Sequence, residues 1–156
     1  QFDRAQDAGD IPVRDVNGMP ARERLYGHWS ILFFGFSRCP DVCPTTLSVL
    51  NLALAGLVDA PTVVMISVDP GDTPAGLDQY VRGFNPDFVA MTGTPSEIEG
   101  LTERWGIAYM DDQQGGIEHS ALLVVLDPQN RHLGYLRPPH HPENIREVVV
   151  SALLPR

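Results

Sequence analysis

Cysteine, lysine and long apolar runs are scarce or missing in this chain of 156 residues. It has only two cysteines, too few for the disulfide framework of a small secreted domain. No stretch approaches the roughly 18 consecutive apolar residues that a membrane span requires. All 11 basic residues are arginine, a composition to which we attach no mechanism.

The charge, size and composition of the chain indicate a folded single domain that does not bind nucleic acid. A formal net charge of -9 repels phosphate backbones and anionic lipid, which excludes nucleic acid as the main partner. Hydrophobic residues make up 43% of the chain and charged residues 20%, so it should fold. We expect a flexible tether over residues 1–10, preceded by an anchor or signal segment, and a single domain over residues 11–156.

Apolar periodicity predicts alternating strands and helices. Two apolar runs, 30–36 and 62–68, are typical of strands buried on both faces, and 88–91 is a shorter candidate. Helices are predicted after Pro44, from Thr73-Pro74, from the capping box at Thr94 and from Pro142. Hairpins are predicted at 11–20, around Asn17-Gly18, and at 121–137.

The order of these elements predicts the fold class. A hairpin is followed by β-α-β-α-β-α and then by β-β-α, which indicates a central mixed sheet covered by helices on both faces. A central strand leading into a cysteine-bearing helix, with a closing β-β-α unit, is the thioredoxin-like layout. We therefore predict an α/β, thioredoxin-like fold with an N-terminal β-hairpin.

The two cysteines lie in the sequence CPDVC, where a buried strand ends and a helix begins. Ligands of open α/β sheets gather at the carboxyl ends of strands. Helix-start N–H groups favour thiolate, the form that ligates soft metals and attacks disulfides. Cys39 and Cys43 could therefore bind a metal, act as a redox pair, or form a plain structural disulfide.

His119 is the candidate third ligand. It precedes the buried strand ALLVVLD, and in a thioredoxin-like sheet the segment entering this strand passes beside the cysteine helix. Two thiolates and one imidazole are a soft, three-coordinate set that suits copper, whereas structural zinc usually takes four ligands. Zinc with an added water stays open, as does an ordinary hydrogen-bonded histidine.

Several blocks of the chain resemble the Sco/SenC copper-chaperone family. They run from about Ile31 to Asp127 and comprise GFSRCPDVCPTTL, ISVDP with the nearby DTP, FNPDF, TGTPSEI and EHSALLVVLDP. Two departures stand out. Glu118 occupies the position of the family's usual Asp before the histidine, and only Gly71 separates Asp69-Pro70 from Asp72-Thr73-Pro74.

The resemblance implies a thioredoxin-like fold and one copper, Cu(I) or Cu(II), held by Cys39, Cys43 and His119. It also implies a copper metallochaperone that serves the binuclear copper site of cytochrome c oxidase subunit II. Other periplasmic copper chaperones or thioredoxin-like reductants are further expected partners, and the domain is expected to act as a monomer. Its expected location is the periplasmic face of the bacterial inner membrane, or the mitochondrial intermembrane space.

Two enzymatic alternatives remain at this point. A thiol-disulfide oxidoreductase would use Cys39 and Cys43 to reduce the cysteines of a partner without delivering metal. A peroxiredoxin-like peroxidase would share the fold, but the pattern around Arg38 and Cys39 matches it poorly. Whether the protein is an enzyme is therefore left undecided by the sequence.

Other polar residues are weaker candidates for the site. Asp41 could orient a ligand, and Asp69 and Asp72 could belong to its outer shell, although Asp72 could equally cap the next helix. The pair His140-His141 suggests a second metal site, but neighbouring histidines in a proline-rich loop are usually just solvated.

Overall fold

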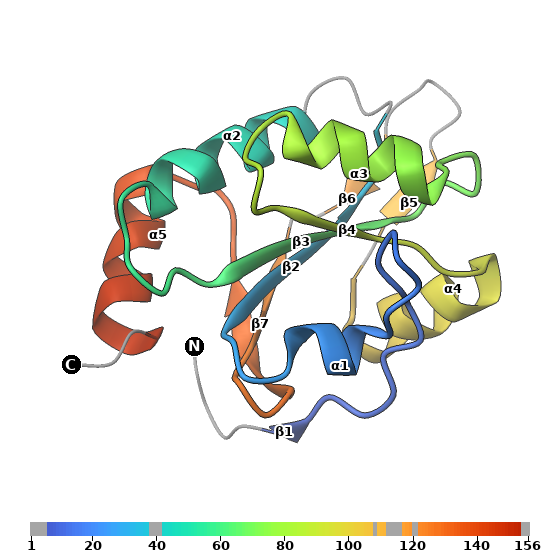
Figure 1. Ribbon diagram of the computed structural model, residues 1–156, viewed down its shortest axis with the longest axis horizontal. Helices are drawn as coiled ribbons and strands as arrows, with labels where there is room; N and C mark the ends of the chain where they lie inside the picture. Colours follow the sequence, from blue (N-terminus) through green and yellow to red (C-terminus); the bar gives the residue numbers. More distant parts are fainter. Residues whose placement is uncertain (1–5, 38–41, 108, 112–116, 120–121, 154–156) are drawn as a thin grey trace.

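A six-stranded mixed sheet forms the centre of the computed structural model (Figure 1). The structure describes residues 6–37, 42–107, 109–111, 117–119 and 122–153. The strands follow the order β1-β8-β7-β2-β3-β4, with bounds β1 (Gln6–Asp7), β2 (Ser30–Gly35), β3 (Thr62–Ser67), β4 (Val89–Met91), β7 (Leu123–Leu126) and β8 (Arg131–Leu136). A separate two-stranded ribbon consists of β5 (Tyr109–Asp111) and β6 (Ile117–His119).

The pairing of the strands makes the sheet mixed, as predicted. β2 is central and runs parallel to β3, which runs parallel to β4. On its other side β2 pairs antiparallel with β7, which forms the predicted late hairpin with β8. The long apolar runs of β2 and β3 are explained by this position, because both faces of these strands are buried.

Helices cover both faces of the sheet. One face carries α2 (Val42–Leu54), α3 (Pro74–Arg82) and α5 (Pro142–Val148), which continues as the π-helical turn η1 (Val149–Leu153). The other face carries α1 (Ala21–Leu25) and α4 (Pro95–Arg104). Ile31 and Phe33 of β2 point into the first core, and Leu32 and Phe34 point into the second. The predicted thioredoxin-like α/β class is thus confirmed.

Two helix starts form as their sequences indicate. The Thr73 side chain accepts a hydrogen bond from the Gly76 N–H at 3.1 Å and caps α3. Thr94 and Glu97 form a reciprocal capping box at the start of α4. The five-residue α1 was not predicted, because it is too short to show helical periodicity.

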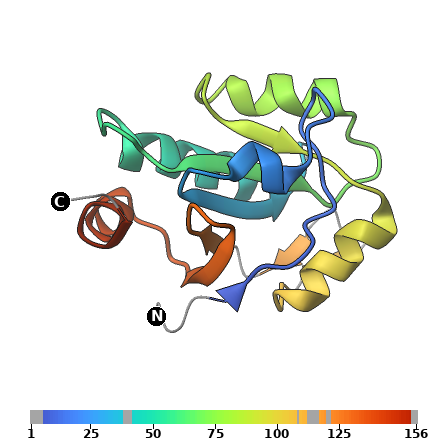
Figure 2. The same cartoon turned by 60° about the horizontal axis from the view of Figure 1, so that its bottom comes forward.

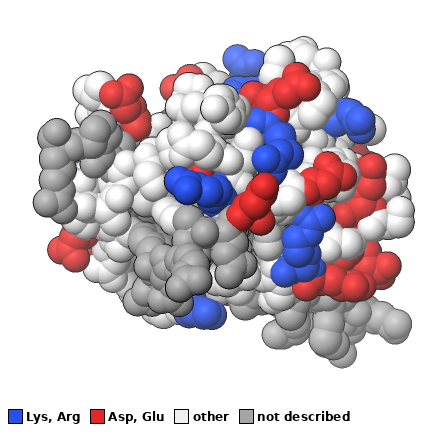
Figure 3. Space-filling view, turned by 90° about the horizontal axis from the view of Figure 1, so that it is seen from below, with Lys and Arg blue, Asp and Glu red and all other residues white. Residues whose placement is uncertain are grey.

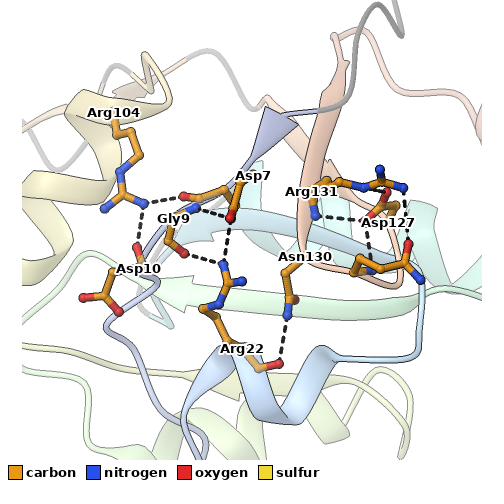
Figure 4. Close-up of polar contacts among 10 residues, drawn as sticks. Asp7, Gly9, Asp10, Arg22, Arg104, Asp127, Asn130 and Arg131 are labelled. Atoms are coloured by element: carbon orange, nitrogen blue, oxygen red, sulfur yellow. Dashed lines mark hydrogen bonds and ion pairs between the residues drawn. The ribbon is translucent and has the colours of Figure 1, made fainter.

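Part of the segment expected to be a tether is attached to the domain. Gln6 and Asp7 pair with β8 in strand β1, which lies beside the β7–β8 hairpin (Figure 2). The Arg104 guanidinium donates to the carbonyls of Ala8 and Asp10 at 2.6 and 2.5 Å (Figure 4). Arg22 donates to the Asp7 carboxylate at 3.1 Å. Residues 6–10 therefore pack as part of the domain, whereas residues 1–5 lie outside the described residues.

The predicted N-terminal hairpin is present in a reduced form. Gly18 has a φ of +83°, the left-handed conformation that the Asn17-Gly18 pair predicts. A single antiparallel bridge between Arg14 and Pro20 closes the turn, and Arg14 also bridges to Thr92 beyond β4. The hairpin thus forms one bridge and joins the strand layer at Thr92.

Candidate metal centre at the carboxyl end of strand β2

The three predicted ligands fall in or beside segments that the structure describes only in part. Cys39 lies outside the described residues. Cys43 is the second residue of α2, and its backbone alone is described. His119 ends β6, where its backbone pairs with Tyr109 of β5, and its side chain is likewise not described. The three-ligand set therefore stays a prediction.

Topology brings Cys43 and the strand that carries His119 to the same end of the sheet. β2 ends at Gly35, and the chain passes from there into α2. β7 runs antiparallel to β2, with Val124 opposite Leu32, so the chain enters β7 at the carboxyl end of β2. β6 comes just before this entry, and Figure 1 shows β6 and the amino end of α2 at this end of the sheet.

The start of α2 is chemically suited to an anionic ligand. Its first turn has no acidic residue. The unpaired N–H groups of a helix start carry partial positive charge and favour a thiolate near them. Pro44, the third residue of the helix, fits a first turn, where a missing N–H costs little. The sequence around Cys43 is thus compatible with a helix start that stabilises a charged sulfur.

A network of hydrogen bonds connects Ser37, which precedes CPDVC in the sequence, to the end of β3. The Asp72 carboxylate accepts from the Ser37 N–H at 3.0 Å and from the Ser37 hydroxyl at 2.5 Å. It also accepts from the Ser67 hydroxyl at 2.7 Å. Asp72 thereby joins Ser37, two residues beyond the end of β2, to Ser67, the last residue of β3.

Asp72 is a candidate from the sequence, whereas Ser37 and Ser67 are site residues that the sequence did not point to. Each serine lies where a buried strand ends, and Gly35 of β2 pairs with Ser67 of β3. Two serines at the ends of neighbouring strands, followed by an aspartate, were the signal available in the sequence. It could not be read without the strand register.

The remaining polar candidates have local roles or lie outside the described residues. Asp69 shapes its own loop, since its carboxylate accepts from the Gly71 N–H at 2.8 Å and its N–H donates to the Ser67 hydroxyl at 3.1 Å. His141 occupies the N-cap position of α5 without a capping hydrogen bond from its side chain. Asp41 lies outside the described residues. Among the side chains that are described, no three His, Cys, Asp or Glu residues gather closely enough to hold a metal ion.

The two titratable side chains with shifted pKa values in β8 belong to an aromatic cluster. Burial lowers the pKa of His132, whose ring lies 4.8 Å from that of Tyr135 and 6.0 Å from that of Trp105. Burial also raises the pKa of the Tyr135 phenol, which donates to the Trp105 carbonyl at 2.5 Å. Trp105 and Tyr135 pack in the core that α1 and α4 cover, on the opposite face of the sheet from α2.

An open polar hollow of about 630 Å³ lies away from the candidate centre. Its lining includes Leu54 at the carboxyl end of α2, Arg82 at the carboxyl end of α3, and Phe88 just before β4. Cys43 is at the opposite end of α2, so this hollow is separate from the metal centre.

Within the described residues, every helix is too short or too polar to traverse a lipid bilayer. Figure 3 shows one face on which arginines lie among acidic side chains.

Comparison with known proteins identifies the family. The model of the SCO1/SenC family matches residues 13–154. This chain belongs to the SCO1/SenC family. A candidate copper-binding protein of Stutzerimonas stutzeri is 33% identical over 154 residues, which cover 92% of this chain and 75% of that protein. The mitochondrial SCO1 homolog 1 of Arabidopsis thaliana is 30% identical over 150 residues, 90% of this chain but 45% of its own length.

Solved structures agree with the fold and with the family. The crystal structure of Arabidopsis thaliana ScoI with copper bound has a TM-score of 0.80, at 28% identity and with 96% of each chain covered. BsSco is described as a member of the Sco family of cytochrome c oxidase assembly proteins. It has a TM-score of 0.76 at 19% identity, and at that distance the likeness shows the fold alone.

Proposed function

We propose that this SCO1/SenC protein binds one copper ion through Cys39, Cys43 and His119 and delivers it to another protein. The observation that carries the proposal is the topology of the ligand segments. The helix whose second residue is Cys43 and the strand that ends with His119 lie at the carboxyl end of β2, where ligands of α/β sheets gather (Figure 1). A copper-bound structure exists for the related ScoI of Arabidopsis thaliana.

The donor set fits copper as a cargo. Two thiolates and an imidazole satisfy the soft, low-coordinate preference of Cu(I), and a three-ligand set leaves room for an incoming donor. A thiol of the receiving protein can then replace one ligand at a time, so that copper is never released into water. The receiving site in this proposal is the binuclear copper site of cytochrome c oxidase subunit II, the target that membership of the SCO1/SenC family suggests.

A copper titration tests the ligand set. The reduced protein is loaded with Cu(I) and then with Cu(II), and stoichiometry and affinity are measured against a chromophoric chelator. The variants Cys43→Ser and His119→Ala remove one donor each, and His28→Ala is a control histidine at an exposed position. We expect the wild type to bind one copper per chain. Either donor variant should bind copper at least about 100-fold more weakly, and His28→Ala should bind it with wild-type affinity. Affinity that is indifferent to His119→Ala would contradict the three-ligand site.

A second proposed activity is thiol-disulfide exchange, favoured by two thiols four positions apart at a helix start. One thiolate attacks a disulfide of the partner, and the second resolves the mixed disulfide. Cys39 and Cys43 are thereby oxidised to a disulfide, while the partner gains two electrons and two protons as a dithiol. Copper-free protein should then reduce an oxidised peptide that carries the two cysteines of the subunit II site, and His119→Ala should retain this rate. Failure of the copper-free protein to reduce the peptide would remove this activity.

For location, we propose a compartment outside the cytoplasm, either the periplasmic face of a bacterial inner membrane or its mitochondrial counterpart. The mitochondrial SCO1 homolog 1 of Arabidopsis thaliana supports a respiratory compartment for the family. Fractionation of cells that express the full-length protein, followed by protease treatment of intact spheroplasts, tests the location. Protection from protease in spheroplasts would contradict it.

A further inference from the structure

One carboxylate connects the sheet to the segment that leads into the first cysteine. Asp72 lies in the loop between β3 and α3 and accepts three hydrogen bonds, two from Ser37 and one from Ser67. The bonds from Ser37 use both its N–H and its hydroxyl, so they hold this residue at two points. A two-point attachment fixes the direction in which the chain leaves β2.

The other end of this connection is anchored in the core. Ser67 is the last residue of β3 and is only 5% exposed. The Asp72 N–H donates to the Asp69 carbonyl at 3.0 Å, and the Asp69 N–H donates to the Ser67 hydroxyl at 3.1 Å. The carboxylate is therefore held in place by the strand end and by its own loop. Ser37 is in turn held against a rigid support.

We infer that Asp72 is a positioning residue for the copper site. Ser37 stands two residues before Cys39 in the sequence, so Asp72 holds the chain two residues before the first proposed ligand. The inference rests on the proposed function, because it concerns the geometry of the same ligand set. Polar groups that orient metal ligands typically contribute about 10–100-fold to metal affinity, and Asp72 acts at one further remove, through the backbone.

Two substitutions of Asp72 distinguish the effect of its hydrogen bonds from the effect of its charge. Oδ2 of Asp72 accepts from the Ser37 N–H and the Ser67 hydroxyl, and Oδ1 accepts from the Ser37 hydroxyl. An asparagine whose carbonyl takes the Oδ2 position keeps the first two bonds. Its NH₂ group can donate to the Ser37 hydroxyl, because a hydroxyl also accepts. Asp72→Asn thus preserves the connection without the charge, and Asp72→Ala removes it.

A matched control exists at the other end of the sheet. The Asp127 carboxylate also accepts three hydrogen bonds, from the N–H groups of Gln129 and Arg131 and from the Arg131 guanidinium. It follows the last residue of β7, Leu126, which pairs with Ser30 at the start of β2. Asp127→Ala therefore removes a comparable network far from Cys43 and reports the effect of lost stability alone.

The experiment measures Cu(I) affinity by chelator competition in wild type, Asp72→Ala, Asp72→Asn, Ser37→Ala and Asp127→Ala, at a temperature where circular dichroism shows each to be folded. Expected results are about 10–100-fold weaker binding in Asp72→Ala and a smaller loss in Ser37→Ala. Asp72→Asn and Asp127→Ala should stay within about threefold of wild type. The sulfur-to-Cu(II) charge-transfer band should shift in Asp72→Ala and not in Asp127→Ala.

Four results of this experiment would contradict the role of Asp72 as a positioning residue. Wild-type affinity and an unshifted band in Asp72→Ala would overturn the inference and leave the proposed function intact. Equal losses in Asp72→Ala and Asp127→Ala would overturn it too, because they would trace to stability. If Asp72→Ala does not fold, wild-type affinity in Ser37→Ala overturns the inference, and Asp127→Asn replaces the alanine control if that variant does not fold. Wild-type protein that fails to bind copper would overturn the proposed function, and this inference with it.

Discussion

Two aspartates at opposite ends of the sheet accept similar numbers of hydrogen bonds but from different distances along the chain. The donors to Asp127 lie within four residues of it, in the turn between β7 and β8 and at the first residue of β8 (Figure 4). Asp72 accepts from Ser37, 35 residues away, as well as from Ser67. The first network stabilises a turn on its own, whereas the second exists only after β2 and β3 have paired. A site that depends on Asp72 is therefore coupled to the folded sheet.

The largest expected effect on stability comes from breaking the turn network. Asp127 is only 4% exposed, and Asp127→Ala leaves the part-buried N–H groups of Gln129 and Arg131 without their acceptor. We expect a loss of about 2–3 kcal/mol in the free energy of unfolding, measured by urea denaturation. Arg131→Ala removes only the half-exposed guanidinium and is the matched control, with an expected loss below about 1 kcal/mol. Equal losses in the two variants would contradict the importance of the turn N–H groups.

A smaller loss is expected when a helix cap is removed on the face away from α2. Thr94 accepts from the Glu97 N–H at 3.2 Å, and Glu97 accepts from the Thr94 N–H at 2.9 Å. Thr94→Ala should reduce the free energy of unfolding by about 1 kcal/mol and leave copper affinity unchanged. Thr94→Ser keeps the hydroxyl and should restore most of the loss. Weaker copper binding in Thr94→Ala would show that α4 is coupled to the copper site. The dependence of the site on Asp72 would then no longer be specific to that end of the sheet.

A pH dependence is expected from His132, which neither aspartate contacts. Burial lowers its pKa in the folded protein below the ordinary value of 6.5. The unfolded chain therefore binds the proton more readily, so this histidine lowers stability as the pH falls through about 6.5 toward its folded pKa, and has no effect above that window. Urea denaturation from pH 7.5 to pH 5 should show a steeper decline in wild type than in His132→Gln. Parallel curves would contradict the assignment.

The smallest expected effect is a coupling between the two aspartate networks. The networks share no hydrogen-bonding residue and lie at opposite ends of the sheet. The losses of unfolding free energy in Asp72→Ala and Asp127→Ala should add in the double variant to within about 0.5 kcal/mol. A larger interaction energy would mean that the strands transmit the change, and the ends could no longer be treated as independent.

Much of the fold could be predicted because its signals are local. The buried runs of β2 and β3, the Thr73 and Thr94 caps and the late hairpin each follow from a few neighbouring residues. The β5–β6 ribbon and the attachment of residues 6–10 could not be predicted in this way. The strands of the ribbon have three residues each, too few to show an alternating pattern. The attachment depends on a partner far along the chain, the Arg104 guanidinium that donates to the Ala8 carbonyl.

The sequence by itself determined the α/β class, because apolar periodicity predicts strands and helices, and it determined the family through its motifs. It also predicted the donor set of Cys39, Cys43 and His119, because cysteine and histidine are ligands of soft metals. Only the tertiary structure decided that the start of α2 and β6 lie at the same end of the sheet, and that Asp72 joins Ser37 to Ser67. Strand order and register settle such contacts. They arise from burying both faces of the sheet at once, a condition that no short stretch of sequence expresses.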